Sequence, residues 1–350
     1  MGEGLLGLIW WGSLSLALLS VLGMLTLVLR RFFLTRRERR AAAWREAIMR
    51  GIVRWLDGDE ELAPIERAAE GRLEIAADLI AELRQVVRGE QRERLAALAG
   101  SLGIVEFNRR RLITGDTRAR RLVAARLAIG PAEHVALALE AALDDPDYQV
   151  RLAAARSLAE LRAIRSVRLL VDKLGLAAEH NSRVLYYIFR QLVPALNGQL
   201  VALLQAERSV VIKGLALDAL GQSGDGTLVE PISRLLDDLS PEVRAKALRA
   251  LADLGYPEAG PRALRALADP AWWVRTQAAV CVGRVGFLPA LPKLAELLAD
   301  EQWWVRFRAA EALYALGEKG RAMLKAAAAA TGGRAARVSE LLLAEKEGAA

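Results

Sequence analysis

The chain has 350 residues, of which 53% are hydrophobic, so it is long enough to form a sizeable core. Its aromatic share of 5% is typical of packed helices and not of sheets. Its formal net charge is +7, and nine arginines against three glutamates in residues 1–55 account for +6 of it. The remaining residues are close to neutral, which argues against a basic groove for nucleic acid.

The residues that usually carry chemistry are scarce. One cysteine, Cys281, excludes an internal disulfide framework, and its place in an apolar helical stripe favours a buried core thiol over a nucleophile. Neither His134 nor His180 has a second His or Cys at ligand spacing. We therefore expect no metal site, no cofactor, no small-molecule substrate and no catalytic triad.

After a short tail at residues 1–4, residues 5–29 form an uncharged run, LLGLIWWGSLSLALLSVLGMLTLVL. As a helix the run is about 37 Å long, enough to cross a hydrocarbon core of about 30 Å. The alternative is a cleavable signal peptide, but Glu3 precedes the run and arginines follow it, which reverses a signal peptide's charge order. The run predicts a single transmembrane helix.

Arginines gather on one flank of this run. The positive-inside rule therefore predicts an N-terminus outside the inner (plasma) membrane and the rest of the chain in the cytoplasm. We expect residues 30–56 to form a basic juxtamembrane helix, whose arginines either attract anionic lipid headgroups or only set the topology. These arginines are Arg30, Arg31, Arg36, Arg37, Arg39 and Arg40.

An acidic, turn-rich stretch at residues 57–64, DGDEELAP, predicts a seam between the membrane anchor and the domain that follows. Residues 57–115 read as irregular helical pairs that begin a stack. Regular repeats are expected over residues 116–317, and an Ala-rich helix followed by an amphipathic helix predicts a cap at residues 318–350.

The repeats are clearest in three segments, DLSPEVRAKALRALADLG, DPAWWVRTQAAVCVGRVG and DEQWWVRFRAAEALYALG, which follow one another at a period of 31 residues. Apolar residues at spacings of three and four predict a long helix in each copy, and its closing glycine predicts a left-handed terminating residue. A second helix that starts near a proline lies between the copies. Paired helices at this period predict an all-α solenoid. The glycines are Gly255, Gly286 and Gly317.

One repeat departs from the pattern. The copy at Arg183 has no Asp six residues earlier, and it places Tyr186 and Tyr187 where its neighbours have small or aliphatic residues. This departure predicts either a change in the curvature of the stack or a locally repacked core.

The Asp-x5-Arg spacing, the Val before the Arg and the D-P-x-W-x-V-R pattern resemble HEAT repeats, particularly the bacterial HEAT-like repeats of phycobilisome lyase subunits. The resemblance implies a HEAT/armadillo-like α-α superhelix and a ladder of acid-base pairs between neighbouring repeats. In this sequence the pairs would be Asp145 with Arg151, Glu207 with Lys213, Asp238 with Arg244, Asp269 with Arg275 and Asp300 with Arg306.

Two adjacent repeats each carry a tryptophan pair. The resemblance assigns Trp272 and Trp303 to packing between hairpins. Trp273 and Trp304 stand where other repeats have polar residues, so they predict exposed rings that bind a protein partner. The alternative is that both rings pack over the adjacent hairpin as core.

Together these patterns predict a membrane-anchored, noncatalytic scaffold whose cytoplasmic solenoid binds a protein partner, such as an integral membrane enzyme or complex. A bilin lyase-like or DNA glycosylase-like HEAT enzyme is one alternative, which lacks an acid-base constellation and a basic groove in this sequence. Direct binding of an anionic lipid surface through the arginine helix is the other.

Overall fold

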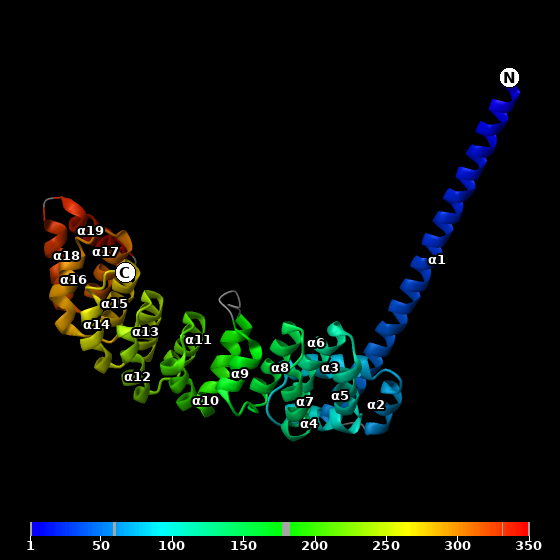
Figure 1. Ribbon diagram of the computed structural model, residues 1–350, viewed down its shortest axis with the longest axis horizontal. Coiled ribbons are helices and arrows are strands. Elements are labelled where there is room, and N and C mark those ends of the chain that lie inside the picture. The colour runs from blue at the N-terminus through cyan, green and yellow to red at the C-terminus, as the bar shows by residue number, and fades with distance from the viewer. Residues whose placement is uncertain (1, 59–60, 177–182, 331, 349–350) are drawn as a thin grey trace. The chain divides into compact units, whose positions relative to one another are not determined.

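The computed structural model describes residues 2–58, 61–176, 183–330 and 332–348, which form helices and connecting turns without a strand among them (Figure 1). Within these ranges the side chains of residues 2–10, 12–18, 21, 33–35, 37, 38 and 347 are not described, so the side chain of Arg37, like the whole of His180, lies outside the described part. The expected all-α class is confirmed. Contacts divide the chain into two units, Met1–Gly115 with Ile129–Val135 and Asp116–Ala128 with Ala136–Ala350.

The first unit begins with one long helix that covers both the apolar run and the basic segment. No helix within the described residues has the length and apolar character needed to cross a membrane. Four shorter helices follow, and the set is α1 (Gly2–Asp57), α2 (Leu62–Ala69), α3 (Leu73–Val86), α4 (Glu90–Ser101) and α5 (Ile104–Thr114).

The last turns of α1 belong to the core of this first unit. Ile48, Ile52 and Leu56 are buried against α2, α3 and α4. Arg94 donates hydrogen bonds to the carbonyl oxygens of Leu56 and Trp55 at 2.9 and 3.0 Å, which satisfies acceptors at the C-terminal end of α1. The basic segment is therefore continuous with α1, and its last turns pack into the domain instead of ending at a seam beside it.

The second unit is a row of paired helices. A longer helix of each pair packs on its counterparts in the neighbouring pairs, as α13, α15 and α17 do. The helices are α6 (Thr117–Arg126), α8 (Tyr148–Glu160), α9 (Val167–Leu174), α10 (Arg183–Ala206), α11 (Val210–Gly221), α12 (Val229–Ser233), α13 (Pro241–Leu254), α14 (Gly260–Ala266), α15 (Trp272–Arg284), α16 (Leu291–Leu297), α17 (Trp303–Ala315), α18 (Glu318–Ala329) and α19 (Gly333–Glu347), while α7 (Ala132–Ala142) crosses from the first unit into the second.

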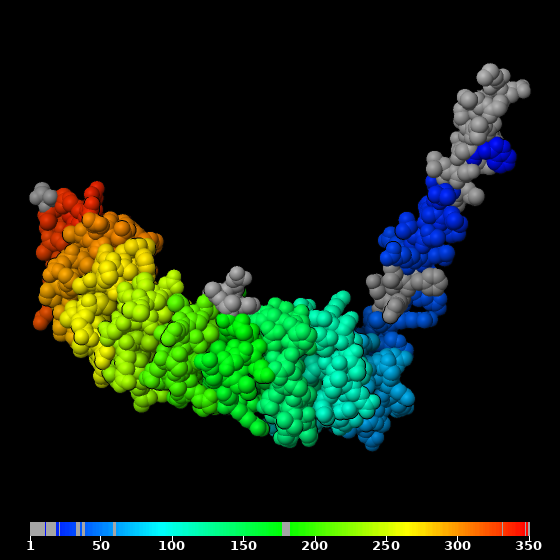
Figure 2. Space-filling view, in the orientation of Figure 1, coloured from blue at the N-terminus to red at the C-terminus, as the bar shows by residue number. Residues whose placement is uncertain are grey.

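The repeat pattern sets how these pairs join. All three predicted closing glycines have positive φ, of 77° at Gly255, 70° at Gly286 and 87° at Gly317. Gly255 ends α13 in the left-handed conformation, as expected, whereas Gly317 has ψ of −154° and precedes the first residue of α18 instead. Helices α15 and α17 also approach closely, because a Cβ at Gly283 would lie 3.0 Å from the Cα of Ala312. Figure 2 shows the repeats from green to orange packed against one another in sequence order.

The irregular repeat at Arg183 is one kinked helix. Its long helix and the next short helix merge in α10, with non-helical φ and ψ at Leu196 two residues after Pro194. Pro194 removes one backbone donor from the helix, and the break follows it at Leu196. Phe189 fills the core at this place and is fully buried.

Cys281 is a core residue, as expected. Its side chain on α15 is fully buried. Burial raises the pKa of the Cys281 thiol to about 12, although the charge of Arg284 opposes the shift. The thiol is therefore neutral near pH 7 and poorly suited to act as a nucleophile.

Candidate functional site

A ladder of polar contacts runs through the turns that precede the long helices of the second unit. At Arg275, Nε and Nη2 donate to the two carboxylate oxygens of Asp300 at 2.9 and 3.0 Å. Its Nη1 donates to the carbonyl oxygens of Asp269 and Pro270 at 2.9 and 3.2 Å. Asp300 in turn accepts a hydrogen bond from the backbone nitrogen of Gln302 at 2.8 Å. One arginine thus ties its own turn to the carboxylate of the next repeat.

The residues expected in the ladder are there, but the pairing predicted from the resemblance is wrong. Asp145, Asp238, Asp269 and Asp300 each bind the base 25 residues before them, in the preceding repeat. Glu207 instead forms an ion pair with Arg168 at 3.7 Å.

The arginine six residues after a ladder aspartate binds the backbone carbonyl of that aspartate, because the tight turn brings the carbonyl oxygen to the guanidinium. The observed side-chain pairs are Arg120 with Asp145, Lys213 with Asp238, Arg244 with Asp269 and Arg275 with Asp300.

The other residues predicted for the ladder, Arg151, Arg306 and Glu207, make some of the same contacts. Arg151 and Arg306 donate to the carbonyl oxygens of Asp145 and Asp300, each at 2.8 Å. Glu207 accepts a hydrogen bond from the backbone nitrogen of Ser209 at 2.9 Å, as the ladder aspartates do two residues on. The ladder therefore fixes the turn in front of each long helix.

Asp238 has a pKa below its ordinary value of 3.8. Burial alone would raise this pKa, but hydrogen bonds from Lys213 and the backbone of Ser240, together with the charges of Lys213 and Arg244, outweigh that effect. Because folding lowers the pKa, the ionised carboxylate stabilises the fold above the ordinary pKa, and this contribution is lost as the pH falls through the folded value.

We expect the thermal midpoint of Asp238→Asn to fall less than that of the unsubstituted chain between about pH 5 and about pH 3, because the variant has lost the linked group. The control is Asp237→Asn, whose side chain is 78% exposed and which should keep the pH dependence of the unsubstituted chain. Equal losses of thermal stability in Asp238→Asn and the unsubstituted chain would contradict the linkage.

Two adjacent repeats of the ladder carry the tryptophan surface, which we define as Trp272, Trp273, Trp303 and Trp304. Helices α15 and α17 both begin with the sequence WWVR, so each pair occupies the first turn of equivalent, packed helices. The arginine of each WWVR holds the preceding turn through its carbonyl oxygens. The ladder thus positions the tryptophans.

All four rings of the tryptophan surface are partly exposed, at 36%, 40%, 42% and 51% in chain order. Trp272 and Trp273 meet edge to face with ring centroids 5.7 Å apart, and Trp303 and Trp304 do so at 4.7 Å. Trp303 also stacks on Phe307 of its own helix at 5.0 Å. The ring-to-ring contacts of Trp272 and Trp303 thus lie within their own helices, and the expectation that these two residues pack between hairpins stays a prediction.

The predicted lipid-binding arginines lie on α1. Arg30, Arg31, Arg36, Arg39 and Arg40 are exposed. In the described part of the chain, no group of three His, Cys, Asp or Glu residues is arranged to hold a metal ion.

Residues 198–281 and 261–343 match the family model of HEAT repeats. Residues 198–343 are HEAT repeats. The helical stack, a HEAT-like solenoid, is similar to solved karyopherins, at 12% identity in each case. They are Kap121p bound to Pho4p, with a TM-score of 0.53 over 82% of this chain and 37% of that chain, Kap121p bound to Nup53p, with 0.52 over 82% and 37%, and Kap121p bound to the SUMO protease Ulp1p, with 0.51 over 81% and 38%.

At this identity the likeness to the karyopherins shows the fold alone, and this chain spans less than two fifths of their length. No protein with curated annotation matches the sequence. A HEAT solenoid is suited to protein interaction, since stacked repeats present long continuous surfaces. The tryptophan surface lies on two of the repeats matched by the family model.

Proposed function

We propose that this chain is a membrane-anchored, noncatalytic scaffold whose HEAT solenoid binds a protein partner through the tryptophan surface. The carrying observation is the cluster of four partly exposed indole rings on adjacent repeats. Tryptophan is enriched among the residues that dominate binding energy at protein interfaces, because it buries a large area at a small entropic cost. The similar karyopherin structures hold the proteins Pho4p, Nup53p or Ulp1p, which supports a protein as the partner.

The experiment that tests this function compares partner recovery by the unsubstituted chain and by a variant of the tryptophan surface. The full chain is purified from native membranes in a mild detergent, and the proteins recovered with it are quantified by mass spectrometry. The proposal is supported if a partner recovered with the unsubstituted chain is lost from the variant. It is overturned if the two chains recover the same proteins in equal amounts.

The membrane part of the proposal is supported by the sequence. Residues 5–29 carry no charge, and six arginines follow them within residues 30–40. This asymmetry favours insertion with the N-terminus outside and the HEAT repeats in the cytoplasm. A scaffold confined in this way would meet partners at the membrane, such as an integral membrane enzyme or complex.

Of two reporters fused after Ala350, we expect only the one that is active in the cytoplasm to show activity. The arginines that follow the apolar run should keep that end of the helix on the cytoplasmic side. The measurement uses paired fusions to alkaline phosphatase, which needs export, and to a cytoplasmic reporter. A matched control variant replaces Arg36, Arg39 and Arg40 with serine. Removing these charges should weaken the preference for a cytoplasmic C-terminal side. An active phosphatase fusion on the unsubstituted chain would contradict the orientation.

The exposed arginines of α1 support a second candidate function, contact with anionic lipid headgroups. The two functions separate cleanly, because substitutions in the tryptophan surface leave these arginines unchanged.

A further inference from the structure

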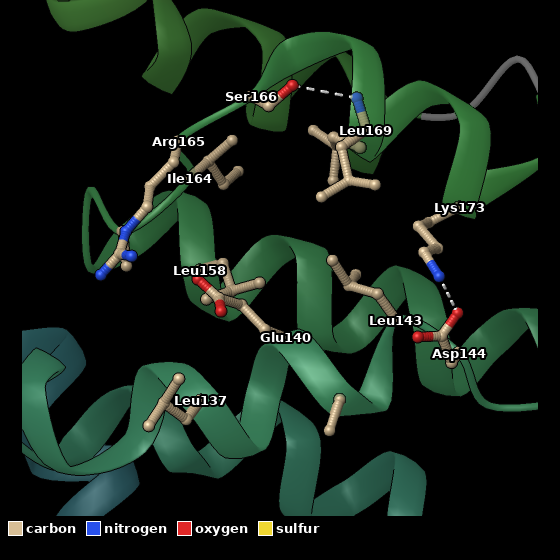
Figure 3. Close-up of a pocket in the computed structure, with 13 residues that line it drawn as sticks. Leu137, Glu140, Leu143, Asp144, Leu158, Ile164, Arg165, Ser166, Leu169 and Lys173 are labelled. Carbon is tan, nitrogen blue, oxygen red and sulfur yellow. Dashed lines mark hydrogen bonds and ion pairs between the residues drawn. The ribbon is translucent and has the colours of Figure 1, made fainter.

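An apolar groove lies between two short helices of the second unit. Its volume is about 520 Å³, within the range of roughly 300–1,000 Å³ that ligand sites occupy. Leu137 of α7 and Leu169 of α9 face it from opposite sides, and Leu158 of α8 lies at its floor (Figure 3). We call this site the α7–α9 groove.

Two leucines on opposite walls of the α7–α9 groove are exposed to water. Leu137 is 74% exposed and Leu169 is 53% exposed. Concave apolar surface rimmed by polar groups is typical of a binding site. Covering both leucines would therefore provide a driving force for association.

Charged residues mark the two ends of the groove differently. At one end Lys173 and Asp144 form an ion pair that joins α9 to α7, so these charges satisfy each other (Figure 3). Toward the other end lies the half-buried Glu140, whose backbone carbonyl accepts a hydrogen bond from Leu143 and whose carboxylate has no hydrogen bond or ion pair with another described residue. Arg165 lies near the same end but is exposed, so water can solvate it.

Glu140 decides the charge of the occupant. A half-buried carboxylate beside leucines loses hydration when the groove is covered, and a cation from the ligand would offset this loss more fully than the exposed Arg165 at the rim. Charge complementarity therefore favours an occupant with apolar groups for the walls and one positive charge at Glu140.

We propose that the α7–α9 groove binds an amphipathic helix of a protein partner that carries Lys or Arg beside its apolar anchors. The two walls are helices that run alongside one another (Figure 3). A third helix can lay its apolar face between them, with anchors at spacings of three and four residues and a neighbouring basic residue directed to Glu140. This site is separate from the tryptophan surface and does not depend on it.

The test presents the full chain, held in a lipid nanodisc, to a displayed library of amphipathic helices. Each helix has leucines at i, i+3, i+4 and i+7, and the flanking positions vary among Lys, Glu and Gln. We expect Lys to be enriched at least 10-fold over Glu beside the leucines. Glu140→Lys should reverse this preference, and Leu137→Ser with Leu169→Ser should reduce helix binding at least 10-fold.

The matched control is Leu239→Ser, which replaces a leucine that is 98% exposed outside the groove and should leave the enrichment unchanged. Circular dichroism checks that each variant is folded. Equal enrichment of Lys and Glu, or a preference that Glu140→Lys leaves unchanged, would overturn the proposal. The proposal would also be overturned if no helix were enriched on the unsubstituted chain relative to the double leucine variant. Binding of only small apolar molecules would overturn it as well.

Discussion

Replacing Trp273 and Trp304 together by alanine is expected to weaken partner capture by about 30-fold or more, equivalent to about 2 kcal/mol. Both rings are near half exposed and belong to equivalent first turns of α15 and α17. A partner that covers them removes their free faces from water, and alanine cannot replace that contact area. The loss should appear as reduced recovery of the partner at equal amounts of bait.

The same double variant should stay folded, with only a small change in its thermal midpoint. Truncating a packed core tryptophan would cost about 3–5 kcal/mol, because it leaves a cavity. Here Trp273 and Trp304 border solvent, so the loss comprises edge-to-face contacts worth about 0.5–1.5 kcal/mol each and the packing of the covered sides alone, which should stay below the loss of a core ring. A large drop in midpoint would show that the rings serve as core.

The control for this pair is Leu239→Ala with Leu288→Ala, which removes exposed apolar side chains elsewhere in the second unit. That variant should keep both stability and partner capture. Loss of capture in the leucine variant to the same extent would mean that general surface hydrophobicity, and not the tryptophan surface, accounts for binding.

Arg275→Ala is expected to lower the free energy of unfolding by about 2–3 kcal/mol. The substitution removes a two-point contact to Asp300 and two hydrogen bonds to the turn before α15. The Asp300 side chain is only 8% exposed, so its carboxylate would be left desolvated without its partner. Urea denaturation followed by circular dichroism measures the change.

Arg284→Ala is the matched control, because Arg284 lies on the same helix and also pairs with an aspartate, Asp253. This arginine is 56% exposed, so its ion pair is screened by water and should contribute less than about 1 kcal/mol. Equal destabilisation by the two substitutions would show that the ladder contact is no stronger than an ordinary surface ion pair.

The ladder shows what periodicity can and cannot predict. A period of 31 residues predicted the helices, their glycine ends and the ladder residues, because those features recur at fixed positions in each copy. Asp269 lies six residues before Arg275 and 25 residues after Arg244, and these two spacings add up to one period. The repeat pattern therefore could not distinguish the partner in the same repeat from the partner in the next one.

Other features depend on contacts that no local pattern records. Ile48 and Ile52 read as part of a basic helix, yet the first unit buries them. Trp303 stacks on Phe307 of its own helix, a contact that the resemblance could not indicate. Leu137 and Leu169 looked like ordinary apolar helix positions, and only the separation of α7 from α9 makes them the walls of a groove.

The most direct test of the scaffold function is crosslinking in living cells with a photoreactive amino acid in place of Trp304, compared with the same amino acid in place of Leu239. We expect one discrete protein adduct from position 304, which additional replacement of Trp273 by alanine weakens, and no such adduct from position 239. Equal adducts from both positions, or none from position 304 in a membrane-embedded and folded chain, would contradict it.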